Sequence, residues 1–312
     1  MQYPLKHSQR GSAIIIALFI MSLVAAIAVA MLSRLNTDIQ RTHLLLNTDR
    51  ANLIAQGSVA WAIDLLIVNW KTQRPNQLVD HMPIHSKTDT IEEYKIDSTL
   101  YDAQSFLNLN NLSVTDNQMS FLNLLKAVDP KIDSVVATDI ALATHDWVSQ
   151  PDAKTQGFDN DYLQKNPSYR APHHFMASAS EIRLVKGMSA SLFSKLSPYI
   201  IALPVITKIN IASAEAAVLM SLSPTLTAEG VKTIIAHRKE SPFNTTQQFL
   251  EFDVIKNNPV PADKITTLSA YFLLQTNVRV GQQNLMLYTL LVRNIKDNQP
   301  NVIVLWQTKG TL

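Results

Sequence analysis

Acidic and amide side chains gather in one stretch of the chain that has the composition of a loop. It holds five oxygen donors, namely Asp146, Asp152, Asp159, Asn160 and Asp161. Carboxylate and amide oxygens are hard ligands, and Ca²⁺ takes about six to eight of them from flexible segments. Their order does not match an EF-hand loop. The residue types are therefore compatible with a calcium site and with a solvated acidic loop.

Catalytic motifs are missing from the sequence. It contains no His-Glu-x-x-His, Gly-x-Ser-x-Gly, phosphate-binding loop or dinucleotide glycine fingerprint, and only 7 glycines in all. The adjacent His173 and His174 have no acidic or thiol neighbour in sequence, which favours a surface loop over a catalytic base or a metal ligand. We interpret Arg170, Glu181 and Arg183 as members of structural ion pairs. The chain is therefore predicted to act by assembly and not as an enzyme.

A helix-hairpin-helix unit for nucleic acid is a competing interpretation of residues 209–250. The run Ile209–Glu215 precedes a second predicted helix at 230–238, but the connection 221–227 contains no glycine. Such units present backbone amides to phosphate through a Gly-rich hairpin. Residues 205–250 carry four basic and three acidic side chains, whereas nucleic acid requires a basic patch. We therefore predict no nucleic-acid partner.

The composition is that of a large folded body with little net charge. The chain has 312 residues, of which 46% are hydrophobic and 17% charged, enough for a sizeable core and for more than one domain. A formal net charge of +2 predicts no strongly electrostatic partner. Cysteine is absent, which excludes disulfides and thiolate metal sites.

Residues 13–32 form an apolar run without a charged side chain. As a helix this run would cover about 30 Å, the thickness of the hydrocarbon core of a bilayer. The short segment before it carries Lys6 and Arg10 and no acidic residue, so the positive-inside rule keeps the N-terminus cytoplasmic. A cleaved secretory signal would have a shorter apolar core followed by a small-residue cleavage site. We expect the run to stay attached to the body.

A second helical pattern follows the apolar run. Residues 34–70 contain no proline, and apolar side chains recur there at helical spacings, at Leu35, Ile39, Leu46, Leu53, Ile54, Ile63 and Leu66. This is the stripe of an amphipathic helix. Membrane span and stem are thus predicted to form one continuous helix, on the order of 80 Å long.

Strand patterns occur in two places that lie far apart in the chain. Alternation from Tyr94 to Leu100, after a predicted loop at 71–92, indicates one strand. Near the C-terminus, segments rich in Val, Leu, Tyr and Trp are separated by turn-forming residues and indicate three strands, at 271–280, 285–292 and 302–307.

The region between these strands, 113–267, is predicted to be helical. Five helix N-caps are expected in it, at Thr115, Ser189, Ser213, Thr227 and Thr245. An isolated hairpin is only marginally stable, so the early strand needs the late strands as partners. We therefore predict an α+β fold in which an antiparallel sheet is interrupted in sequence by a large all-α insertion domain.

The N-terminal arrangement resembles that of type IV pilins and of the pseudopilins of type II secretion systems. The shared features are a basic leader ending in Gly11, an apolar helical half and an amphipathic helical half. The resemblance implies that a prepilin peptidase cuts between Gly11 and Ser12, with methylation of the new N-terminus. Most members carry a Glu at the fifth residue after the cut, where this chain has Ile16. Because a carboxylate in hydrocarbon is costly unless paired, its absence suits a subunit with no neighbour above it in the filament.

Motifs along the body resemble, in the expected order, the minor pseudopilin K family of type II secretion. They are Tyr101–Leu112, Asp146-Trp147, Gly157–Tyr162, Pro167–Arg170, Glu181–Gly187, Ile209–Glu215, Pro242-Phe243 and Phe249-Leu250. The resemblance implies a pilin-like domain whose N-terminal helix packs on the sheet, and calcium in the helical insertion. It also implies minor pseudopilins I and J as partners in a tip complex, together with the other pseudopilins of the filament.

These inferences predict five segments. They are a cytoplasmic leader at 1–11, a transmembrane helix at 12–33, a pilin-like stem with the first strands at 34–112, the insertion at 113–267 and C-terminal strands at 268–312. By the resemblance the chain is expected to cross the inner membrane once, with its bulk in the periplasm, and to cap the tip of the pseudopilus. Two alternatives remain open, a minor pilin of a type IV pilus and a single-span membrane-anchored module that binds an exported substrate.

Overall fold

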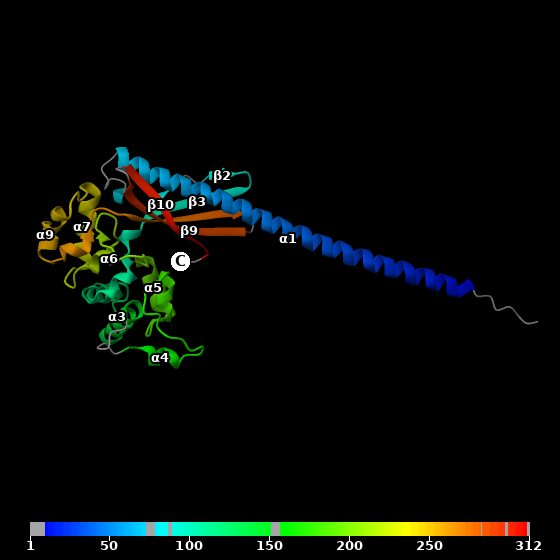
Figure 1. Ribbon diagram of the computed structural model, residues 1–312, viewed down its shortest axis with the longest axis horizontal. Coiled ribbons are helices and arrows are strands. Elements are labelled where there is room, and N and C mark those ends of the chain that lie inside the picture. The colour runs from blue at the N-terminus through cyan, green and yellow to red at the C-terminus, as the bar shows by residue number, and fades with distance from the viewer. Residues whose placement is uncertain are drawn as a thin grey trace, which may run out of the picture. The chain divides into compact units, whose positions relative to one another are not determined.

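The computed structural model describes residues 10–72, 79–86, 89–150, 157–281, 283–296 and 299–310. The chain consists of two compact units, Met1–Ile54 and Ala55–Leu312. One long helix, α1, begins in the first unit and ends in the second, which also contains an antiparallel sheet and a block of short helices (Figure 1).

Helix α1 runs from Arg10 to Thr72 without a proline, as the sequence predicts. In the first unit its large apolar side chains from Ile14 to Leu32 are each at least 50% exposed. The predicted stripe is exposed there as well, since Leu35 is 56% and Leu53 74% exposed. The described part of the first unit is thus a helix whose N-terminal half presents apolar side chains around its circumference.

A stripe of α1 that shares only Leu66 with the predicted one is buried in the second unit. Its members are Ala55, Val59, Ala62 and Leu66, each at most 5% exposed. Their spacing of three or four residues places them on one face of the helix. A search for large apolar residues finds only part of this stripe, because half of it is alanine. Side chains this small allow the helix backbone to lie close to the sheet.

The sheet has six strands, all paired antiparallel. Its main path is β3 (Tyr94–Asp102), β8 (Tyr271–Val280), β9 (Gln283–Lys296) and β10 (Gln299–Lys309). The short strands β1 (Ile84–His85) and β2 (Asp89–Ile91) pair with the other edge of β3. The expected loop at 71–92 is therefore wrong in part, because its second half extends the sheet. The split sheet itself is confirmed, since β3 precedes the helical block and β8 to β10 follow it.

The end of α1 packs across one face of this sheet (Figure 1). Val59, Ala62 and Leu66 share a core cluster with apolar residues of the strands, including Leu100, Phe272, Leu274 and Leu291. A buried hydroxyl is also satisfied at this interface, because Ser98 Oγ donates to Ser58 Oγ of α1 at 2.9 Å. The opposite face of the sheet carries a separate apolar cluster that includes Tyr101, Leu273, Leu290 and Trp306.

The helical block contains eight α-helices in the part of the chain that the structure describes. They are α2 (Gln118–Val128), α3 (Ser134–Val148), α4 (Asp159–Leu163), α5 (Ala190–Leu196), α6 (Ala216–Met220), α7 (Ala228–Glu240), α8 (Thr246–Leu250) and α9 (Asp253–Lys256). Short 3₁₀ helices connect several elements: η1 (Val79–His81), η2 (Ala103–Ser105), η3 (Leu109–Ser113), η4 (Thr115–Asn117), η5 (Ala179–Leu184), η6 (Ser197–Tyr199) and η7 (Ala262–Lys264). The block is not purely helical, because it includes short parallel strand pairs. These are β4 (Leu107–Asn108) with β5 (Ile200–Ile201), and β6 (Ile209–Asn210) with β7 (Ile265–Thr266).

Two apolar cores stabilise the block. The first is built around Phe121, Ile140, Trp147, Tyr162 and Leu196, and the second around Ile211, Val231, Ile234, Phe249 and Ile265. Gly187 is required at the first core, because its φ is +84° and an added Cβ would lie 2.8 Å from Ile140 Cγ1.

Three of the five expected N-caps are confirmed. The side chains of Ser189, Thr227 and Thr245 each accept a backbone N–H three residues later. The other two were wrong. Thr115 lies inside η4, and α2 begins only at Gln118. Ser213 donates its hydroxyl to Asp102, while Glu215 occupies the cap position of α6.

A set of polar side chains between the sheet and the helical block forms what we call the polar seam, comprising Asp102, Gln104, Asn108, Asn110 and Asn111. Asp102 is 1% exposed, and its carboxylate accepts the backbone N–H of Gln104 and the hydroxyls of Ser213 and Ser269. The Gln104 side chain bonds to the backbone on both sides, at Lys208 O (3.1 Å) and Ala270 N (2.7 Å). The end of β3 is thereby tied to two segments more than 100 residues further along the chain.

The asparagines continue the polar seam. Asn110 is fully buried and donates to the carbonyl oxygens of Met176 (3.0 Å) and Leu203 (2.8 Å), while its Oδ1 accepts from Met176 N (2.8 Å). Asn108 and Asn111 make similar bonds to the backbone between residues 203 and 207. Between residues 106 and 112 β4 is the only strand, because η3 turns the chain so that these amides reach their partners.

Arg293 on β9 is buried below the C-terminal end of α1. Its guanidinium lies over the rings of Trp70 (4.7 Å) and Phe272 (4.9 Å) and donates to Ser269 O at 3.0 Å. Burial lowers the pKa of Arg293 to about 10. Burial thus disfavours the charge on Arg293, and the faces of the two aromatic rings offset part of this cost.

Replacing Asn110 tests the polar seam. In Asn110→Ala two buried carbonyls and one buried N–H lose their partner, so we expect a loss of at least about 3 kcal/mol in the free energy of unfolding. The measurement is urea unfolding of the full chain in detergent, followed by the fluorescence of the buried Trp147. The exposed Asn294 provides the control, and Asn294→Ala should cost less than about 1 kcal/mol. Equal losses in the two variants would refute the role assigned to the seam.

Asp102 should make stability depend on pH. Burial, the largest influence, raises the pKa of the Asp102 carboxyl above its ordinary value of 3.8, although hydrogen bonds from Ser213 and Ser269 oppose the shift. The folded state therefore holds the proton more tightly than the unfolded state. The stabilisation of the folded state by protonated Asp102 is complete below about pH 3.8. It is lost as the pH rises through the pKa that Asp102 has in the folded state. Asp102→Asn should remove this component, so that the stability difference between wild type and variant changes across that window. Parallel pH profiles from pH 3.5 to 7.5 would contradict the assignment.

Candidate functional site

The first candidate site is the exposed apolar part of α1. Gly11 and Ser12 lie in the first turn of this helix. Ile16 is 58% exposed and is surrounded in sequence by apolar side chains that are also exposed. By length and composition the helix Ala13–Trp70 could cross a membrane, with a mean hydropathy of 3.0 in a window of which 0% is buried. A helix that is apolar on every side requires a lipid or protein environment.

The second candidate site is the acidic stretch between α3 and α4. Asp146 lies in the last turn of α3, is 6% exposed and accepts the backbone N–H of Phe158 at 3.3 Å. Asp159 begins α4 and accepts the backbone N–H of Ala171 at 3.2 Å. The His173 ring stands between them, with Nδ1 4.0 Å from Asp146 Oδ1 and Nε2 3.8 Å from Asp159 Oδ1.

His173 is thus the residue that joins two of the predicted oxygen donors. Its backbone is left-handed, with φ at 51°, and its Nδ1 lies 3.0 Å from the carbonyl oxygen of Asp146. The sequence interpretation placed His173 in a surface loop without an acidic partner. No local signal could reveal the pairing, because Asp146 and Asp159 lie well before it in the chain and approach it only in the folded block.

Two of the other predicted donors, Asn160 and Asp161, do not join this group. The Asp161 carboxylate is 2.8 Å from Lys186 Nζ, and Asn160 is exposed on α4. Asp152 lies outside the described residues. Within the described ranges no three His, Asp or Glu side chains are placed to hold a metal ion. Asp146 and Asp159 alone fall short of the six to eight oxygen ligands typical of calcium, so the fit of this metal is partial.

An aromatic cluster of Trp147, Tyr162 and Tyr169 packs beside the acidic stretch. Trp147 meets Tyr162 edge-on at 5.4 Å, and Tyr162 stacks on Tyr169 at the same distance. Tyr162 Oη accepts the backbone N–H of Lys186, and burial raises the pKa of this phenol to about 12. The cluster is the rigid base on which Asp146, at the end of α3, and Asp159, at the start of α4, are positioned.

The ion pairs expected for Arg170, Glu181 and Arg183 are not formed among the described residues. Glu181 instead caps η5, where its carboxylate accepts the backbone N–H groups of Ala177 and Ser178. Arg183 lies over the Phe193 ring at 5.4 Å. Both side chains are structural, but their partners are backbone and aromatic groups.

Comparison with known proteins places these features in one family. Two family models, both described as type II secretion system protein K, match residues 105–205 and 209–269, together just over half of the chain. Among curated relatives, type II secretion system protein K of Aeromonas hydrophila is 26% identical, over 95% of this chain and 96% of its own. The protein of the same name from Klebsiella pneumoniae is also 26% identical, over 92% of this chain and 93% of its own.

A solved structure shares the fold. It is a chain in the crystal structure of the GspK–GspI–GspJ complex of the type 2 secretion system of enterotoxigenic Escherichia coli, with a TM-score of 0.71 and 22% identity. The match covers 87% of this chain and 100% of the other. It confirms the predicted α+β architecture, in which a long N-terminal helix packs on an antiparallel sheet that a helical block interrupts in sequence.

Proposed function

The chain belongs to the family of type II secretion system protein K, and from this premise we propose that it caps the tip of the periplasmic pseudopilus as a minor pseudopilin. There it initiates assembly and supports protein export. One observation carries the proposal: the exposed apolar part of α1 has Ile16 where pairing with a subunit above would need a carboxylate. A subunit without that group can end a filament.

Membrane anchoring follows from the length and apolarity of α1. We propose a single pass through the inner membrane, with the basic residues Lys6 and Arg10 on the cytoplasmic side. The sheet and the helical block then lie in the periplasm. Prepilin peptidase acts on the cytoplasmic side, between Gly11 and Ser12, and methylation of the new N-terminus follows.

The proposed partners are minor pseudopilins I and J, which together with this chain form the tip complex. The supporting observation is the fold shared with the chain from the GspK–GspI–GspJ complex. The exposed apolar side chains of α1 provide the surface for packing against helices of these partners and of the other pseudopilins.

The proposed function is architectural and requires no catalysis. The family match favours secretion over a type IV pilus, and processing at Gly11 distinguishes a pseudopilin from an unprocessed membrane-anchored binding module.

A carboxylate at position 16 tests the tip assignment. In Ile16→Glu the new side chain has no subunit above it to neutralise it, and we expect assembly to weaken by about 2.5–3.5 kcal/mol, the cost of a charge in the apolar region. Co-purification of I and J from membranes and secretion of an exoprotein should both fall. Ile16→Leu, which keeps the apolar volume, should behave like wild type.

Two results would contradict this proposal. One is full assembly and secretion by Ile16→Glu, which would place an amine next to residue 16. The other is a mature protein that still begins at Met1, since mass spectrometry should find Ser12 as the first residue.

We also propose that calcium binds the acidic stretch through Asp146 and Asp159. Both carboxylates face His173, so calcium and the imidazole compete for the same oxygens. Asn160 and Asp152 remain candidate ligands, whereas Asp161 is engaged by Lys186. Calcium bound here would link the end of α3 to the start of α4.

Calorimetric titration of the full chain in detergent with CaCl₂ tests this site. Asp146→Asn and Asp159→Asn should each weaken binding about 10-fold or more, because a charged ligand is lost. Asp129→Asn is the matched control, since Asp129 pairs with Lys195 outside the acidic stretch. The proposal fails if calcium produces no heat and no thermal shift relative to chelator. It also fails if Asp129→Asn weakens binding as much as the other two variants.

A further inference from the structure

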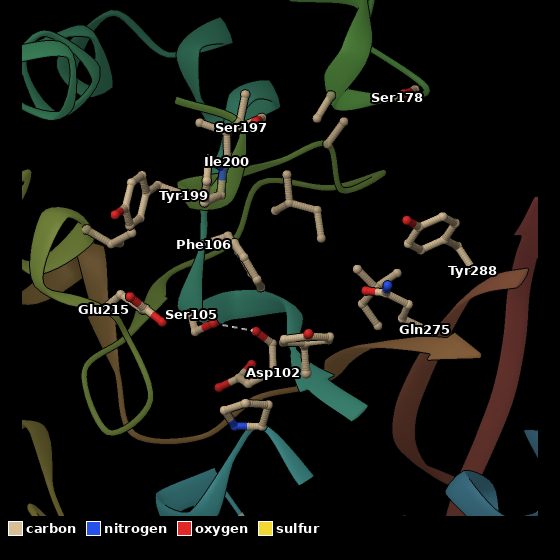
Figure 2. Close-up of a pocket in the computed structure, with 18 of the residues that line it drawn as sticks. Asp102, Ser105, Phe106, Ser178, Ser197, Tyr199, Ile200, Glu215, Gln275 and Tyr288 are labelled. Atoms are coloured by element: carbon tan, nitrogen blue, oxygen red, sulfur yellow. Dashed lines mark hydrogen bonds between the residues drawn. The ribbon is translucent and has the colours of Figure 1, made fainter. Parts of the chain in front are cut away.

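A pocket of about 400 Å³ lies between the sheet and the helical block of the second unit. Figure 2 shows Tyr288 and Gln275 of the sheet on one side of it and Phe106, Tyr199 and Ile200 on the other. The volume falls within the range of about 300–1,000 Å³ that is typical of ligand pockets. Several lining residues belong to the sheet cluster on the face opposite the end of α1.

Aromatic side chains contribute to the walls of the pocket on several sides. Six aromatic residues line it: Tyr101, Phe106, Phe193, Tyr199, Tyr288 and Trp306. A β-bulge between Val304 and Trp306 places Trp306 on the pocket side, because the extra residue reverses the alternation of faces along β10. Before the bulge, Val302 lies in the cluster under α1, and after it Trp306 lies in the opposite cluster. A regular strand would have turned Trp306 away from this pocket.

Among the described residues, the charged side chains that line the pocket are all acidic. They are the carboxylates of Asp102 and Glu215, and the lining that the structure describes contains no Lys, Arg or His. Asp102 is occupied by its hydrogen bonds within the polar seam. Glu215 is exposed and makes no side-chain cap bond to α6. The nearby Arg238 is not part of the lining, and its guanidinium donates to the carbonyls of Ile211 and Ala214.

The pocket also has neutral hydrogen-bonding groups at its margin. Ser178, Ser180, Ser197 and Gln275 line it. Among the described residues the Gln275 amide makes only a weak contact, at 3.5 Å from the sulfur of Met286. Hydroxyl and amide groups of this kind match the N–H and C=O groups of a polypeptide backbone. Aromatic walls, one exposed carboxylate and such a rim together favour a peptide over an anionic ligand such as a phosphate.

We propose that this pocket binds an extended segment of another polypeptide, which inserts an aromatic side chain between the aromatic walls and places an adjacent Lys or Arg beside Glu215. The inference rests on the proposed function in one respect, namely that the chain works by contacting other polypeptides. The aromatic ring provides most of the affinity by edge and face contacts. The basic neighbour provides discrimination by pairing with the exposed carboxylate of Glu215.

Peptide titration of the full chain in detergent tests the proposal. The probes are dansyl-labelled ten-residue Ser/Gly peptides with a central Phe-Lys, Phe-Glu or Ala-Lys pair, and the readout is fluorescence anisotropy. Phe-Lys should bind about 10-fold tighter than Ala-Lys, which lacks the ring. It should bind about 3- to 5-fold tighter than Phe-Glu, and Glu215→Gln should remove this charge preference.

A variant that fills the pocket distinguishes peptide binding at this site from non-specific adsorption of the peptides. Ala177 lines the pocket and is exposed, so Ala177→Trp should abolish Phe-Lys binding. Ala190→Trp adds the same ring at the exposed start of α5, away from the lining, and should bind like wild type. Equal affinity for the three peptides, or unchanged binding in Ala177→Trp, would overturn the proposal. The titration needs neither I nor J, so failed co-purification with intact peptide binding would count against the tip assignment alone.

Discussion

Backbone groups that leave water must find hydrogen-bond partners, and the irregular segments between the sheet and the helical block have no helix or extended ladder to provide them. The polar seam supplies these partners. Asp102, Gln104 and Asn110 reach backbone or hydroxyl groups at 176, 203, 208, 213 and 269–270. Because each seam side chain bonds to a distant segment, the seam sets where the helical block sits against β3 and β8.

Both candidate sites of the second unit depend on this arrangement. Asp102 and Ser213 both line the aromatic pocket and are hydrogen-bonded directly to each other at its wall, which ties the end of β3 to the helical block beside the pocket. Asn110 hydrogen-bonds to both the N–H and the C=O of Met176, which lies three residues after His173. The loop that brings His173 between Asp146 and Asp159 is thereby held in place. A buried polar network of this kind specifies one arrangement, since any shift would leave charged or polar groups without partners.

Helix α1 shows how one element serves two environments. In the second unit its small residues Ala55 and Ala62 let the backbone lie against the sheet, with Val59 and Leu66 filling the gaps. In the first unit large apolar residues surround the helix and remain exposed. The C-terminal part of α1 is thus buried against the sheet of the same chain. The exposed N-terminal part remains available to lipid or to partner helices. Ile16 lies in this exposed part, outside the contacts between α1 and the sheet.

Local patterns predicted the elements whose formation depends on near neighbours. Strand β8 was predicted with its observed bounds, and Ser189, Thr227 and Thr245 cap their helices because a cap bond spans only three residues. The apolar run of α1 and the division of the sheet around the helical block also follow from sequence. Gly11, Ser12 and Ile16 were singled out by the resemblance to pilins and pseudopilins, and the roles proposed for them involve partners outside the chain.

Tertiary structure decided the features that depend on distant residues. Ser213 has the sequence of a helix cap, yet it donates to Asp102, a residue 111 positions earlier. His173 gained two carboxylate neighbours and Asp161 was drawn to Lys186, which divides the acidic stretch that composition alone presents as one cluster. The bulge in β10 reversed the face of Trp306 and so completed an aromatic pocket. The chemistry of each residue, which the sequence gives, determines whether its side chain needs a hydrogen-bond or ionic partner. Which distant group becomes that partner is decided only in the folded chain.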